Sequence, residues 1–84
     1  MTFQVHIHIV PRKGLLDPQG KAVADALHAL GFADVRDVRV GRHLVVETSA
    51  GSAGAAEKAA RAMCEKLLAN PVTEDFELAR VEAL

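Results

Sequence analysis

Two histidines one residue apart are the first groups in this sequence that could do chemistry. His6 and His8 fall in an alternating segment, so both imidazoles are expected on one strand face, about 7 Å apart. A zinc site normally takes four ligands, and only His43 and Glu47 are placed to add to the pair. We therefore predict no metal site and interpret both histidines as interface or solvent-facing groups. Independent metal binding through the pair is kept as a third hypothesis for the chain.

The one cysteine, Cys64, is the next candidate, because a thiolate is a nucleophile. It falls in the middle of an expected helix with no base nearby, whereas a reactive cysteine needs a polarising and partly exposed setting. We predict a packed thiol. Ser49 and Ser52 match no nucleophile motif.

Glycines and carboxylates could also bind or catalyse, but their spacing favours structural roles. Gly41 and the pair Gly51 and Gly54 match no phosphate-binding fingerprint, so we expect them in turns and caps. Glu47 and Glu74-Asp75 are interpreted as strand-surface charges. The sequence therefore predicts no catalytic residue and no active site on this chain.

Hydrophobic spacing predicts the elements that carry these residues. The alternation from Phe3 to Ile9 is typical of a strand buried on one face. Asp17 and Pro18 suit a helix start, and Gly31 suits its end. The predicted order is strand 3–9, a helix from 17 to 31, strands 35–40 and 44–48 joined by a hairpin at 41–42, helix 55–69 and strand 74–81. The helix stripes expected to face the core are Val23, Ala26, Leu27 and Leu30, then Ala56, Ala60, Met63 and Leu67.

This β-α-β-β-α-β order predicts an α+β fold, a ferredoxin-like sandwich with a four-stranded antiparallel sheet and two helices on one face. The other face of the sheet would stay uncovered. It would carry His6, His8, Val38 and Val40, which we predict as self-association residues.

Composition limits the classes of function. The 84 residues, half of them hydrophobic, predict one domain over 1–84. Its small size gives marginal stability, which oligomerisation can relieve. The net charge of −1 argues against nucleic acid or membrane as a partner. The start of the chain has no pattern of a signal peptide, so we expect a cytoplasmic protein.

Other proteins of this fold class bind RNA, copper or metabolites. RNA binding on such a sheet needs stacking aromatic residues, but the chain has three Phe and no Tyr or Trp. A copper chaperone would carry a Cys-x-x-Cys loop, which a single cysteine cannot form. A regulatory module that binds a small metabolite at a subunit interface remains the alternative function.

Three stretches carry a family pattern: Leu16–Val23, Asp37–Arg42, and Met63–Val72 followed by Glu74-Asp75-Phe76. In this order they resemble the PurS family, the small subunit of the multi-subunit phosphoribosylformylglycinamidine synthase (FGAM synthase) of purine biosynthesis. Only the stretch 49–60 departs from the pattern, because it is richer in Ala and Gly than relatives tend to be.

The resemblance implies a role within a larger enzyme. The complex would convert formylglycinamide ribonucleotide to the amidine, using ATP, magnesium and glutamine, with no cofactor on this chain. A large synthetase subunit would bind ATP and the ribonucleotide, and a glutaminase subunit would release ammonia. The small subunit would pair with itself, as a dimer or tetramer, and bridge the other two.

The first family block is also the predicted docking surface for these partners. It comprises Leu16, Asp17, Pro18, Gln19, Gly20 and Lys21. Glycine near a helix start costs up to ~1 kcal/mol relative to alanine, so its absent side chain needs a reason. Either a partner backbone approaches Gly20, or the helix packs closely within its own chain; the sequence supports both equally.

Overall fold

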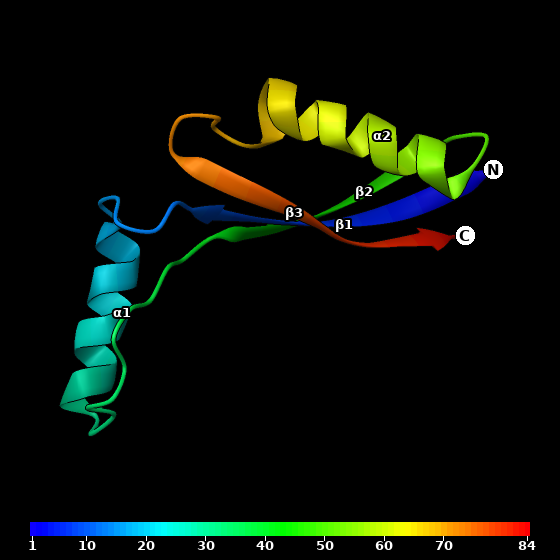
Figure 1. The fold of residues 1–84 in the computed structure, drawn as a ribbon. Coiled ribbons are helices and arrows are strands. Elements are labelled where there is room, and N and C mark those ends of the chain that lie inside the picture. Colours follow the sequence, from blue (N-terminus) through cyan, green and yellow to red (C-terminus); the bar gives the residue numbers. More distant parts are fainter.

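The computed structural model describes all 84 residues as two helices and one three-stranded antiparallel sheet. The elements are β1 Thr2–Pro11, α1 Pro18–Ala29, β2 Arg42–Ser49, α2 Ala53–Met63, the π-helical turn η1 Cys64–Leu68, and β3 Glu74–Ala83. The strand order is β2-β1-β3. Figure 1 shows α2 lying along one face of the sheet. Helix α1 stands away from the sheet, at the end opposite to the two chain termini.

The buried residues lie between the sheet and α2. Every second side chain of β1 faces this layer, and the buried set is Phe3, Val5, Ile7, Ile9, Ala56, Ala60, Cys64 and Ala69. Phe76 and Leu78 of β3 pack at its edge. The predicted alternation of the first strand is thus confirmed. Alanine at the helix face allows α2 to lie close to the sheet.

Enlarging one of these alanines should destabilise the fold. Ala60→Leu adds three carbons where no space is left, because Ala60 is completely buried, and overpacking of this kind costs about 1–3 kcal/mol. We expect a lower urea midpoint by circular dichroism. Ala59→Leu, on the exposed side of the same helix, is the matched control and should change little; equal losses in both would contradict the packing described.

The predicted fourth strand is absent, and the prediction of a four-stranded sheet is wrong. Residues 35–40 pair with no strand, and the predicted hairpin at 41–42 is instead the point where β2 begins. The chain does not fold back at 41–42: residues 35–40 lead directly into β2, whose first residue, Arg42, lies opposite Ile9 of β1. Gly41 does not form a turn but packs against the carbonyl oxygen of Ile9, which an added Cβ would meet at 2.1 Å. Residues 35–40 therefore stay outside the sheet and pair with no strand.

The prediction that both helices cover one sheet face is also wrong. No sustained contact joins α1 to the sheet or to α2, and Figure 1 shows α1 alongside the chain that leads into β2. We call residues 30–41 the connecting segment, and the stretch from Leu15 through α1 to the end of this segment the arm. The radius of gyration is 16.0 Å, against about 12 Å for a compact chain of this length. The molecule is therefore elongated, measuring 50 × 26 × 14 Å.

The second helix also ends differently from the prediction. Ala56 and Ala60 are buried as expected, and the Glu57–Arg61 pair forms at 3.8 Å. Leu67, however, is 82% exposed. The π-helical turn shifts the phase of the helix after Met63, so that Cys64 and then Leu68 face the sheet in place of Leu67.

Candidate docking site

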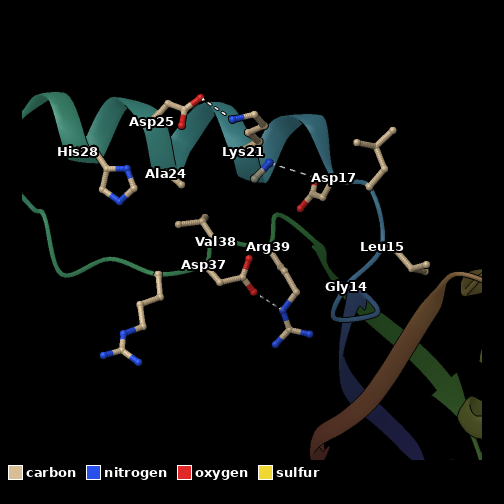
Figure 2. A pocket seen from close by; sticks show the side chains of 13 residues that line it. Gly14, Leu15, Asp17, Lys21, Ala24, Asp25, His28, Asp37, Val38 and Arg39 are labelled. Atoms are coloured by element: carbon tan, nitrogen blue, oxygen red, sulfur yellow. Dashed lines mark hydrogen bonds and ion pairs between the residues drawn. The ribbon is translucent and has the colours of Figure 1, made fainter.

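A cavity of about 340 Å³ lies between the first turns of α1 and the connecting segment (Figure 2). Four of the six predicted docking residues line it: Leu16, Asp17, Gly20 and Lys21. Pro18 and Gln19 do not. Val38 closes the cavity from the connecting segment. The first family block and the second, 37–42, are thus brought together here.

Asp17 links the start of α1 to the connecting segment, the two elements that line this cavity. One carboxylate oxygen accepts a hydrogen bond from the backbone N–H of Gly20 at 3.1 Å, which caps α1 as predicted. The other oxygen accepts from the backbone N–H of Val40 at 2.9 Å. These N–H donors, that of Val40 above all, hold the pKa of Asp17 below its ordinary value of 3.8.

This carboxylate makes the arm sensitive to acid. Because the folded pKa is lowered, Asp17 stabilises the arm above its ordinary pKa, and this contribution is lost as the pH falls through the lowered value. We expect the amide signals of Gly20 and Val40 to move together in an NMR titration to low pH. Asp17→Asn should abolish that titration, because a carboxamide does not ionise, and it should also lose one of the two hydrogen bonds, because it has a single acceptor oxygen.

The titration must be followed at the amide signals of Gly20 and Val40, because a second carboxylate also responds to acid. Glu74, held by Asn70 and Arg42 at the end of the sheet next to the arm, also has a lowered pKa and will weaken the core in acid. Signals of Gly20 and Val40 that do not respond to acid before the core unfolds would contradict the role given to Asp17.

Gly20 is the only buried residue of α1. A Cβ atom built there would lie 2.0 Å from the carbonyl oxygen of Val38 and 2.4 Å from Oδ2 of Asp17. Close packing within the chain therefore explains this glycine, and the partner-backbone interpretation is not needed for it. The docking role of the six-residue block stays a prediction.

The charges around the cavity are balanced and weakly held. Lys21 Nζ lies 3.2 Å from Asp25, and Arg39 Nε lies 3.8 Å from Asp37 (Figure 2). Both pairs are exposed, so each contributes little to stability. His28 donates to the carbonyl of Val35 at 2.6 Å and joins the C-terminal part of α1 to the connecting segment. Such a lining of mixed sign favours a protein surface over an anionic ligand.

Large apolar side chains lie open on the arm, and two of them, Val23 and Leu30, belong to the helix stripe that the sequence predicted to face the core. Leu16 is 87% exposed, Leu30 74% and Phe32 57%. Leu15 and Val23 are also exposed. We call these five residues the apolar strip. The helical stripe could be found from the sequence, but its lack of a cover could not, because no local pattern shows that residues 35–40 stay outside the sheet.

The uncovered face of the sheet holds only half of the predicted self-association residues. His6 and His8 lie there, together with His43 from β2. Val38 and Val40 do not, because they belong to the connecting segment beside α1. The four residues therefore do not form one surface. Their role in self-association stays a prediction for each location separately.

Cys64 is the side chain most able to act as a nucleophile, and the fold places it in the core. Cys64 is fully buried, and burial raises the pKa of its thiol, so it is the packed thiol that the sequence predicted. No three histidine, cysteine or acidic side chains converge as they stand on a metal position. None of the helices combines the length and hydropathy needed to cross a bilayer.

These features define a small α+β chain whose open apolar surface is suited to binding other protein chains. Comparison with known proteins agrees: the family model for PurS, described as phosphoribosylformylglycinamidine (FGAM) synthase, matches residues 4–82. The chain belongs to the PurS family.

Individual relatives give the same result. The PurS subunit of FGAM synthase from Bacillus subtilis is 39% identical over 74 residues, which are 88% of this chain and 87% of the relative. The structure of PurS from Thermus thermophilus matches with a TM-score of 0.86 and 42% identity, covering 100% of this chain and 99% of that one. A chain in the structure of PurLQS from Thermotoga maritima matches with a TM-score of 0.81 and 28% identity over 100% and 99%.

Proposed function

We propose that this chain assembles with itself and bridges the synthetase and glutaminase subunits of FGAM synthase, so that ammonia passes between them. Membership of the PurS family supports a place in that glutamine-dependent ligase. ATP, magnesium and glutamine are then used by the other subunits, and this chain binds none of them. The single observation that carries the bridging role is the apolar strip, which has no cover within the chain.

The arm offers two adjoining surfaces for two kinds of contact. Leu15, Leu16 and the cavity lie at its base, near the sheet, and would receive a larger subunit. Val23, Leu30 and Phe32 lie further along it and would be covered by a second copy. Large exposed apolar side chains gathered on one part of a chain often mark a contact with another protein, and residues 35–40 also lack strand partners for their backbone groups. A second copy of the chain could cover these apolar side chains and supply hydrogen-bond partners for the backbone of residues 35–40.

The sheet face is the less suitable surface for joining two copies. It carries three histidines, Arg80 and the glutamates at 47, 77 and 82, with Val45 as its one large exposed apolar residue. Pairing this face would require many polar groups to lose water. We therefore propose the arm, and not the sheet face with His6 and His8, as the self-association surface.

Reconstitution tests the proposed role. Glutamine-dependent formation of the amidine is measured with purified synthetase and glutaminase subunits, with and without this chain. We expect product only when the chain is present, while free ammonia, which needs no transfer between subunits, supports a rate that does not depend on it. Equal glutamine-dependent rates with and without the chain would contradict the bridging role.

The alternative, a regulatory module for a small metabolite, has one observation in its favour. The cavity of about 340 Å³ falls in the range of ligand pockets, roughly 300–1,000 Å³. Thermal unfolding of the isolated chain with purine nucleotides and with glutamine distinguishes the two functions. A saturable rise in melting temperature without any partner protein would favour the metabolite site.

A further inference from the structure

The outer edge of β2 is an open strand edge that continues into the connecting segment. The N–H of Ala50 donates to the carbonyl of Met1 in β1's direction, so by alternation the odd-numbered residues of β2 direct their N–H and C=O groups outward. The N–H of Val40 is likewise held by Asp17, which leaves the odd-numbered positions before it outward as well. Within residues 36–39 no backbone group forms a hydrogen bond in the chain. Figure 1 shows this stretch entering β2 without a turn.

The opposite edge of the sheet is less suited to receive another strand. A bulge in β3 leaves Ala79 without a partner in β1, and bulges twist an edge away from further pairing. The pairing of β2 with β1 has no such irregularity, and β2 contains no proline. The edge of β2 is therefore the one open to strand addition.

A second copy of the connecting segment is the strand that fits this edge. Residues 35–40 have the pattern of the strand that the sequence predicted to pair with β2. A two-residue turn at 41–42 within one chain would set Val40 opposite His43, and would thereby turn Val40 to the open face of the sheet. Pairing between two copies needs no turn, and a register that joins even-numbered residues keeps Val38 and Val40 on the face covered by α2.

We propose that two copies of the chain exchange their arms, so that residues 35–40 of each copy pair antiparallel with β2 of the other. Exchange of one element between identical chains is a low-cost route to a dimer. In this pairing Arg39 lies opposite Glu47 of the second copy, and Val40 lies opposite Val46. Two strands of this kind, related by a two-fold axis, join both sheets into one.

Charges select this register over its neighbours. Glu47 forms no ion pair within its own chain, and Arg39 has only an exposed contact of 3.8 Å with Asp37. A shift of two residues in one direction would set Asp37 opposite Glu47, and like charges directly opposite each other destabilise a sheet. A shift in the other direction would set Gly41 there, which offers Glu47 no partner.

The exchange would also cover part of the apolar strip. Because Asp17 holds the start of α1 to the connecting segment, α1 of one copy would be carried to a place beside α2 of the other. Leu44 and Val46 on that face of β2 are only partly buried within the single chain. Val23 and Leu30 of the second copy would complete their cover. The inference rests on the self-assembly in the proposed function and adds its surface and register.

Charge reversal tests the pairing. Arg39→Glu and Glu47→Arg should each weaken self-association by about tenfold in sedimentation equilibrium, because two symmetric pairs turn from attractive to repulsive. The double variant should restore it. Arg36→Glu is the matched control, since it reverses another exposed arginine of the segment, and it should not restore the Glu47→Arg variant. All these positions are exposed, so the variants should fold, which circular dichroism checks.

Nuclear Overhauser effects in a sample that mixes isotope-labelled and unlabelled chains give a second measurement. We expect contacts between residues 39 and 47 that join different chains. No rescue in the double variant, or contacts between 39 and 47 within one chain, would overturn the exchange. If Leu30→Asp still dissociates the copies in that case, self-assembly through the arm stands and only the exchange is wrong; the reconstitution assay tests bridging separately.

Discussion

Gly20→Ala should separate α1 from the connecting segment while the sheet and α2 stay folded. Alanine forms helices better than glycine by about 1 kcal/mol, so a helix free of other constraints would gain stability. Here the added Cβ meets the carbonyl oxygen of Val38 and the carboxylate of Asp17. Overpacking costs about 1–3 kcal/mol. The first obstacle is backbone, and the second is a carboxylate held in place by hydrogen bonds from the N–H groups of Gly20 and Val40. We therefore expect a net loss of stability confined to the arm.

Hydrogen exchange measures this effect segment by segment. Amides of residues 30–41 should exchange faster in the variant, while those of β1 should keep their protection. The glutamine-dependent activity of the reconstituted enzyme should also fall in this variant, because the connecting segment no longer lines the cavity beside α1. Gly51→Ala is the matched control, since nothing lies within 4 Å of the Cβ it would add. Unchanged exchange at 30–41 would contradict the close packing at Gly20.

Leu30→Asp should dissociate copies of the chain. Leu30 is 74% exposed in the single chain, so a carboxylate there would be hydrated and harmless to the isolated fold. Covered by a second copy, the same charge would lose its water without gaining a partner, which proteins tolerate poorly. We expect a lower molar mass by light scattering and an unchanged circular dichroism spectrum.

The control for this experiment is another exposed leucine. Leu67→Asp places the same charge on η1, where the side chain is 82% exposed, and it should leave the mass unchanged. A mass that Leu30→Asp does not alter would return the sheet face, with His6 and His8, to first place as the self-association surface.

Local features of the chain could be predicted from the sequence. The first strand alternates because one face is buried, and its side chains follow that pattern in the structure. Asp17 caps α1 with Pro18 in its first turn, and Gly31 takes a positive φ of 99° just after the helix. Each of these results depends on residues close together in the chain, and this is why the sequence was sufficient.

Long-range features could not be predicted in the same way. The pattern of residues 35–40 is that of a strand, but whether it pairs depends on whether the chain folds back at 41–42, which the alternation of these residues does not show. The stripe of α1 likewise shows which side is apolar and not what covers it. For the docking site, the block 16–21 could be found, whereas its contact with Val38 and Val40 depends on the path of the connecting segment.

The elongated shape has a consequence for how the subunit behaves before assembly. The arm and the sheet with α2 share few contacts, so they form two cooperative units whose opening energies differ. We expect the arm to open locally while the rest stays native, in which case partners would select one of the arm positions that it samples. In a free subunit the sheet and α2 would then form the ordered part. Part of the binding energy in the complex would be used to hold the arm in one position.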